Sequence, residues 1–111
     1  MTYCVADKRY REDGKLDIYL SVSGHADYAE HGEDIVCSAV SSLCVSLANT
    51  ISQAGVPGAS INVSPGLFVV NAVVEENRKY IEGAFDMALT GMKSISEQYP
   101  DHVFFSSGVS H

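Results

Sequence analysis

The sequence predicts a two-layer α+β sandwich of order ββαββαβ, in which two helices pack on one face of a mixed or antiparallel sheet. Residues 16–23 (LDIYLSVS) alternate between apolar and polar side chains, which is typical of a half-buried strand. Residues 35–53 carry apolar side chains at steps of three and four, which is typical of an amphipathic helix. At 111 residues the chain can bury one core, so we expect a single domain over residues 1–111.

The chain begins with a predicted hairpin. Residues 2–9 form a less regular strand, and the Glu-Asp-Gly-Lys run at 12–15 is a turn signal before the strand at 16–23. One dense basic cluster falls beside this turn, and we expect solvated charges on its members Lys8, Arg9 and Arg11.

The helix over 35–53 has recognisable ends. Asp34 stands at the N-cap position, where a side-chain oxygen accepts a hydrogen bond from a first-turn N–H. Gly55, followed by Pro57, marks the stop. The expected apolar stripe consists of Val36, Val40, Leu43, Leu47 and Ile51.

The second half of the chain repeats the order of hairpin and helix and adds a final strand. These elements are expected at residues 59–64, 67–74, 75–99 and 102–107. Pro65-Gly66 forms the hairpin turn, and Pro100 ends the helix. We expect residues 107–111 to form a frayed tail.

The acidic composition limits the classes of partner. The net charge is −7, from fourteen Asp and Glu against seven Lys and Arg. Such a field repels nucleic acid and anionic lipid and favours basic partners, so we expect no direct nucleic-acid or membrane partner. No run approaches the roughly twenty uninterrupted apolar residues of a membrane span, and the N-terminus carries charges where a signal peptide is apolar. We therefore expect a cytoplasmic protein.

The three cysteines have different expected roles. An odd number without secretion features argues against a disulfide framework. Cys4 lies in the first strand and is expected to be structural, and Cys44 falls on the buried side of the first helix. Cys37 lies in the first turn of that helix, where unpaired N–H groups and the helix dipole stabilise a thiolate and an oxyanion.

Histidines on the loop at residues 24–34 could serve as the base for this thiol. His25 directly follows a strand, and the loop is long enough to fold it back onto the helix start as a Cys–His dyad. His31 is closer in sequence, but its position favours a direction along the helix. Asp34 has two competing roles, as N-cap or as the group that orients the histidine. Ser41, one turn after Cys37, is either a hydrogen-bond donor to the sulfur or a small packing residue.

Two non-enzymatic interpretations use the same region. One is an acidic module that binds a basic protein without cutting it. The other is a metal-bound regulatory protein whose ligands would be His25, His31, Asp34 and Cys37. Zinc sites usually show paired ligands at short fixed spacing, and calcium loops have an EF-hand spacing that is missing from Asp27, Glu30, Glu33 and Asp34. We therefore expect no metal and no cofactor.

The run GHADYAEHGEDIVCSAVS at residues 24–41 resembles the signature of the bacterial ribosomal-processing cysteine protease family, often called Prp. The matching positions are Gly24-His25-Ala26, the run Gly32 to Cys37, and Ser41. Residue 38 is Ser where the family more often has Ala. Chain length, acidic balance and the ββαββαβ order extend the resemblance over residues 1–111, as a single cysteine-protease domain.

The resemblance implies a cysteine endopeptidase that removes a short N-terminal extension from the twenty-seventh large-subunit ribosomal protein. It implies Cys37 as nucleophile and His25 as base, with Asp34 assisting. It also implies a homodimer, and an active-site loop hinged at Gly24 and Gly32 that closes over substrate.

The substrates of the resembled family suggest a hypothesis for specificity. The extension is hydrophobic and ends at a lysine-rich junction. Acidic side chains of the loop would attract the lysines, while an apolar groove takes the aromatic side. The expected substrate-binding residues are Asp27, Glu30, Glu33 and Ser41.

Overall fold

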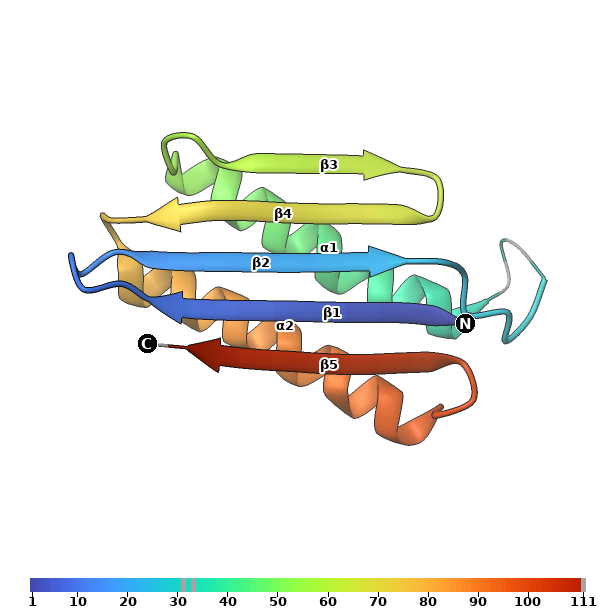
Figure 1. The fold of residues 1–111 in the computed structure, drawn as a ribbon. Helices are drawn as coiled ribbons and strands as arrows, with labels where there is room; N and C mark the ends of the chain where they lie inside the picture. Colours follow the sequence, from blue (N-terminus) through green and yellow to red (C-terminus); the bar gives the residue numbers. More distant parts are fainter. Residues whose placement is uncertain (31, 33, 111) are drawn as a thin grey trace.

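The computed structural model describes residues 1–30, 32 and 34–110. The predicted order ββαββαβ and the α+β class are confirmed (Figure 1). The elements are β1 (Thr2–Tyr10), β2 (Leu16–Ser23), α1 (Ile35–Ala54), β3 (Ser60–Ser64), β4 (Leu67–Val74), α2 (Arg78–Gln98) and β5 (Val103–Ser110).

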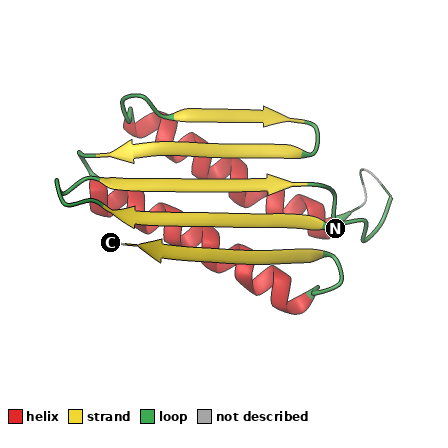
Figure 2. Ribbon diagram, viewed as in Figure 1, coloured by secondary structure: helices red, strands yellow, loops and turns green. Residues whose placement is uncertain are grey.

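The sheet has five strands in the order β3-β4-β2-β1-β5. The β1–β5 pair is parallel, and the other pairs are antiparallel, so the sheet is mixed. Both helices cover the same face of the sheet (Figures 1 and 2). β1, which the sequence predicts as the less regular strand, is an interior strand between β2 and β5, and its Cys4 is fully buried.

The core lies between the sheet and the two helices. Strand β2 buries the predicted apolar face, because Leu16, Ile18, Leu20 and Val22 are each at most 8% exposed. The buried stripe of α1 consists of Val36, Val40, Cys44, Leu47 and Ile51. By length and composition α1 also falls within the range of helices that cross membranes, which its serine-interrupted sequence did not indicate. Its buried stripe accounts for that apolar composition in a core helix.

The predicted ends of α1 are confirmed. Asp34 has an extended backbone and accepts a hydrogen bond of 2.9 Å from the Cys37 N–H, so it is the N-cap. Gly55 is left-handed, with φ of 66°, and closes the helix. Helix α2 begins at Arg78 rather than near residue 75, because Asn77 adopts a left-handed conformation that no helix interior contains.

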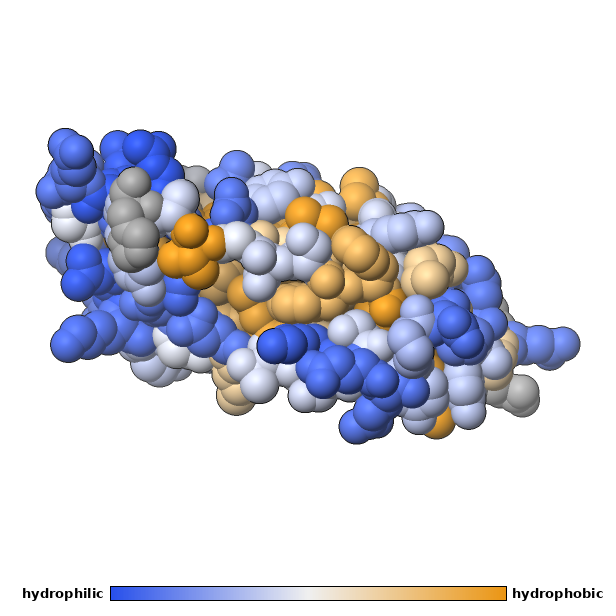
Figure 3. All heavy atoms as spheres, turned by 60° about the horizontal axis from the view of Figure 1, so that its bottom comes forward, coloured by the Kyte–Doolittle hydropathy of each residue, from blue (hydrophilic) through white to orange (hydrophobic). Residues whose placement is uncertain are grey.

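The predicted frayed tail is wrong for residues 107–110. Strand β5 continues to Ser110 and pairs with β1 in parallel as far as Arg9. Backbone hydrogen bonds to β1 hold the end of β5 in the sheet, and such bonds cannot be predicted from the periodicity of side chains. Figure 3 turns the β5 side toward the viewer and shows apolar side chains gathered between two polar ends. The hollow between β5 and α2 is lined in part by Leu89, Phe105 and Val109.

The expectation of solvated charge is wrong for Lys8. Its side chain is 11% exposed and lies against α2, with Nζ 3.0 Å from Glu82 Oε2 and 2.9 Å from Asp86 Oδ1. The Tyr10 hydroxyl donates a hydrogen bond to Glu82. Alternation along β1 places Lys8 on the helix-covered side, where its charge needs partners.

Glu82 makes the fold sensitive to acid. The Tyr10 hydroxyl, followed by Lys8, lowers the pKa of Glu82 despite its partial burial. Because the pKa of Glu82 is lower in the folded than in the unfolded state, its ionised carboxylate stabilises the fold at any pH above the pKa of the unfolded state. This stabilisation is lost as the pH falls through the pKa of the folded state. We expect Glu82→Gln to reduce the unfolding free energy by about 2 kcal/mol at neutral pH. In urea titrations, the difference in unfolding free energy between Glu82→Gln and wild type should decrease toward about pH 3. A difference that does not depend on pH would contradict this prediction.

Candidate active site

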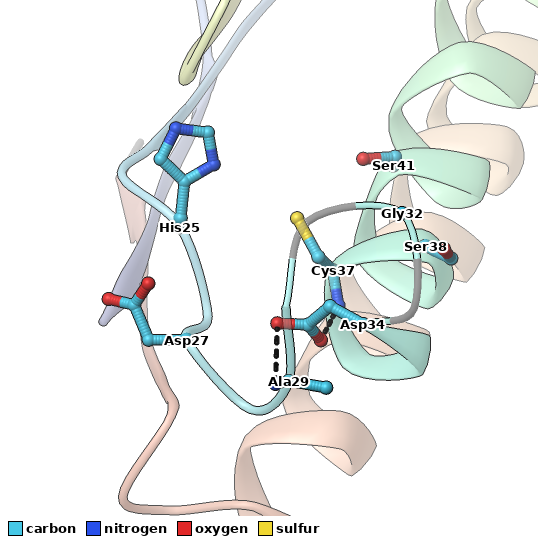
Figure 4. Close-up of a pocket in the computed structure, with 8 residues that line it drawn as sticks. All are labelled: His25, Asp27, Ala29, Gly32, Asp34, Cys37, Ser38 and Ser41. Atoms are coloured by element: carbon cyan, nitrogen blue, oxygen red, sulfur yellow. Dashed lines mark hydrogen bonds between the residues drawn. The ribbon is translucent and has the colours of Figure 1, made fainter.

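A pocket of about 480 Å³ lies where the chain leaves β2 and enters α1. It brings together most of the residues that the sequence indicated (Figure 4). The lining residues are His25, Asp27, Ala29, Gly32, Asp34, Cys37, Ser38 and Ser41. The pocket is therefore built from the predicted active-site loop and the first two turns of α1.

Cys37 is the third residue of α1 and is half-buried. Its sulfur points from the helix into the pocket (Figure 4). The expectation of unpaired N–H groups beside it needs correction, because the Cys37 N–H donates to Asp34 Oδ1 and the Ser38 N–H donates to the Asp34 carbonyl oxygen at 3.0 Å. The N-cap therefore already uses the two donors closest to the sulfur.

His25 lies across the pocket from Cys37, on the loop that follows β2 (Figure 4). Its ring is exposed, and no hydrogen bond joins it to the Cys37 sulfur within the part of the chain that the structure describes. The β3–β4 turn supports the ring from the other side, since a Cβ added to Gly66 would lie 3.2 Å from His25 Nε2. The two members of the predicted dyad thus share one pocket, and their pairing stays a prediction.

Asp34 fastens the loop to the helix. Its Oδ1 caps Cys37, and its Oδ2 accepts the N–H groups of Tyr28 at 2.9 Å and Ala29 at 3.4 Å. Burial raises the pKa of Asp34, but the backbone hydrogen bonds from Cys37, Tyr28 and Ala29 outweigh burial and hold it below its usual value. Both carboxylate oxygens are occupied by backbone groups, so the geometry favours the N-cap role over orientation of His25.

The remaining acidic residues of the loop are placed differently. The Asp27 side chain is 78% exposed and lies 3.4 Å from the amino group of Met1. Glu30 is exposed and does not line the pocket. Glu33 and His31 lie outside the described residues. Of the loop carboxylates that the structure describes, Asp27 and Asp34 line the pocket.

The two predicted hinge glycines have different surroundings. Gly24 has φ of +86°, its N–H donates to the Gly66 carbonyl oxygen at 2.9 Å, and an added Cβ would lie 2.4 Å from the Met1 carbonyl oxygen. Gly32 has φ of +92° and open space around the position of a Cβ. Gly24 is thus packed as an anchor, and only Gly32 has room for a hinge.

A second hollow of about 280 Å³ opens on the other side of His25 and Cys37, between α1 and the β3–β4 hairpin. Ser41 also lines both hollows. The apolar side chains here belong to Val22, Val40, Val45, Val63, Leu67 and Phe68. The exposed Val63 and Leu67, which flank the hairpin turn, are the one signal in the sequence that could have indicated this groove.

Metal binding gains no support from the geometry. Within residues 1–30, 32 and 34–110, no group of three His, Cys, Asp or Glu side chains could hold a metal ion. The proposed ligand set also includes His31, which is outside those residues.

Cys37 should be the one thiol that reacts in the folded protein. Cys4 and Cys44 are buried, which raises the pKa of the Cys4 thiol to about 11 and that of the Cys44 thiol to about 12. We expect iodoacetamide at neutral pH to add one group per chain, at Cys37, with the other two reacting only in urea. Peptide mass spectrometry measures this, and labelling of Cys4 or Cys44 in the folded protein would contradict it.

Comparison with known proteins decides the family. A family model described as "Cysteine protease Prp" matches residues 6–104. The chain belongs to the Prp cysteine protease family. No curated protein matches the chain.

Solved structures share the Prp fold at low sequence identity. The ribosomal processing protease Prp from S. aureus, in complex with a covalently linked product peptide, is 24% identical with a TM-score of 0.74, over 94% of this chain and 98% of that one. The same protease with a substrate peptide gives a TM-score of 0.70 at 24% identity, over 96% and 99%. SMU.848 from Streptococcus mutans gives 0.75 at 24% identity, over 98% and 95%.

Proposed function

We propose that the protein is a cysteine endopeptidase that removes a short N-terminal extension from a basic protein of the large ribosomal subunit, the twenty-seventh. One observation carries the proposal: the Cys37 sulfur, at the start of α1, faces the His25 ring across an open pocket (Figure 4). Membership of the Prp family supplies the reaction class. The likeness to a ribosomal processing protease from S. aureus supports the choice of substrate.

The chemistry follows the roles of a Cys–His dyad. The Cys37 thiolate attacks the scissile carbonyl, and His25 gives a proton to the leaving amine as the C–N bond breaks. The acyl group remains on sulfur as a thioester. His25 then takes a proton from water, which hydrolyses the thioester and frees Cys37. Because Asp34 already accepts the Cys37 N–H, we assign the oxyanion to the Ser41 hydroxyl and the positive end of α1.

The two hollows support the proposed specificity. Both open at Cys37 and His25, and one contains Asp27 and Asp34 while the other is lined mainly by apolar side chains. A peptide bound across Cys37 would place its aromatic side in the apolar groove and its lysines beside the carboxylates. Glu30 and Glu33 would extend this acidic side of the loop.

Reversing charge at the loop should weaken substrate binding. We expect Asp27→Lys with Glu30→Lys to raise KM for an extension peptide by about three- to tenfold at low ionic strength, with kcat little changed. Glu75→Lys with Glu76→Lys makes the same change in net charge at the opposite end of the sheet and serves as the control. Equal KM values for the two double variants would contradict charge reading by the loop.

Cleavage itself is tested with a synthetic peptide that spans the extension and the first residues after it. Two fragments should appear by mass spectrometry with wild type and be absent with Cys37→Ser and with His25→Ala. An intact peptide that co-elutes with wild-type protein would favour the binding module instead.

The setting of the reaction is also part of the proposal. We infer a homodimer from the family resemblance, and the cytoplasm from membership of a family of ribosomal processing proteases. The acidic composition suits a basic substrate. Sedimentation analysis should give about twice the mass of one chain. The mass of a single chain at micromolar protein concentration would contradict the homodimer.

A further inference from the structure

We propose that the turn between α2 and β5, residues 99–102, is a fixed platform that holds the active-site loop. His102 and Tyr28 are then positioning residues for His25 and Cys37. This inference rests on the proposed function, because it assigns the turn a part in the same reaction. None of these contacts is apparent in the signature at residues 24–41, since the platform begins at Tyr99, 58 positions after Ser41.

The first contact holds the residue next to the base. His102 Nδ1 lies 2.9 Å from the Ala26 carbonyl oxygen, although the two residues are 76 positions apart. A carbonyl oxygen only accepts, so Nδ1 carries the proton and donates. Ala26 itself is 1% exposed. Ala26, the residue after His25, is therefore held by a hydrogen bond to its carbonyl oxygen and by burial of its methyl group.

The second contact is aromatic. The Tyr28 ring meets the Tyr99 ring edge-to-face at 5.3 Å between centroids, and the His102 ring at 5.4 Å in the same arrangement. These are favourable geometries for aromatic pairs. The loop therefore rests on the platform at two points, one on each side of Asp27.

The contacts continue from Tyr28 to the nucleophile. The Tyr28 N–H donates to Asp34 Oδ2, and Asp34 Oδ1 accepts the Cys37 N–H. One series of contacts thus runs from the platform through Tyr28 and Asp34 to Cys37. A second series runs from the platform through Ala26 to His25. One short turn supports both members of the predicted dyad.

The platform is itself well anchored. The N–H groups of His102 and Val103 donate to the Tyr99 carbonyl oxygen at 2.9 and 3.0 Å. The Thr2 N–H donates to the His102 carbonyl oxygen at 2.9 Å, which joins the turn to β1. Thr2 is 2% exposed. A support tied to α2, β5 and β1 in this way can hold the part of the loop from Ala26 to Tyr28 in one position.

The key test compares two replacements of His102. Asparagine can place an amide N–H near the position of Nδ1, whereas leucine fills similar space without a donor. We expect His102→Leu to lower kcat on the extension peptide about ten- to a hundredfold with KM changed less than about twofold, because the base is misplaced while the binding groove is intact. His102→Asn should recover most of kcat. Equal loss of kcat in both variants, or no loss in His102→Leu, would overturn the proposal.

A second readout does not need peptide cleavage. The rate of Cys37 alkylation against pH reports how the imidazole and the thiol influence each other. We expect the profile of His102→Leu to move toward that of His25→Ala, and the profile of His102→Asn to stay with wild type. If the wild-type protein cuts no peptide but the alkylation profiles of the variants change as expected, the proposed function is wrong and the role of the platform is supported. If wild type cuts and the His102→Leu profile is unchanged, the platform fails alone.

The contact of the Tyr28 ring with the platform is tested with its own variants and control. Tyr28→Ala should lower kcat, while Tyr28→Phe, which keeps the ring, should not. Tyr80→Ala removes a tyrosine on α2 that is 63% exposed and controls for loss of a surface ring. A fall in kcat with Tyr28→Phe as large as with Tyr28→Ala would show that ring packing is not what positions the loop.

Discussion

Replacing Cys37 with serine is expected to lower kcat for cleavage of the extension peptide by about a thousandfold or more, with the fold unchanged. A serine hydroxyl is almost fully protonated at neutral pH and is a much weaker nucleophile than a thiolate. The half-buried position of Cys37 leaves room for the smaller oxygen, so the unfolding free energy should stay within about 0.5 kcal/mol of wild type. Initial rates and urea titrations measure both quantities.

Cys4→Ala is the control for loss of a thiol. Cys4 is fully buried in β1, so this variant should lose about 1 kcal/mol of stability while its kcat stays near wild type. If Cys37→Ser cuts the peptide at a rate close to that of Cys4→Ala, the nucleophile lies elsewhere.

Replacing His25 with alanine should have the second largest effect, lowering kcat by about a hundred- to ten-thousandfold. The imidazole is the group that faces the sulfur across the pocket, and the leaving amine needs its proton (Figure 4). The dependence of kcat on pH should also flatten, because the group that carries the proton is gone. A stopped assay across the pH range measures both; an unchanged profile with full activity would assign the base to another residue.

Side-chain periodicity predicted β2, β4 and the two helices because each of these elements buries a single face. The alternation in β2 and the stripe of α1 report that face directly, and Asp34 and Gly55 mark the ends of α1 through local backbone chemistry. Strand β5 could not be followed to Ser110 in the same way. Its last residues are exposed and mostly polar, and backbone pairing with β1 holds them.

The candidate site was predictable where the residues are close in sequence. Cys37 and Asp34 are separated by three positions, so the helix start places them together whatever the rest of the chain does. The position of His25 depends on tertiary contacts, with Gly66 on one side and the His102–Ala26 hydrogen bond on the other. No local pattern encodes those contacts. For the same reason, only the structure shows that Asp34 Oδ1 accepts the Cys37 N–H, so that this donor is not left unpaired for an oxyanion.

The central claim is that the substrate passes through a thioester on Cys37, and capture of this thioester tests it most directly. Protein in excess over extension peptide is quenched in acid at a series of times, and the intact mass is measured. We expect a transient species heavier by the mass of the N-terminal fragment less one water, mapped to the peptide that contains Cys37 and absent from Cys37→Ser. Fragments that accumulate at every time with no such adduct on Cys37, or with the adduct on another residue, would contradict the account.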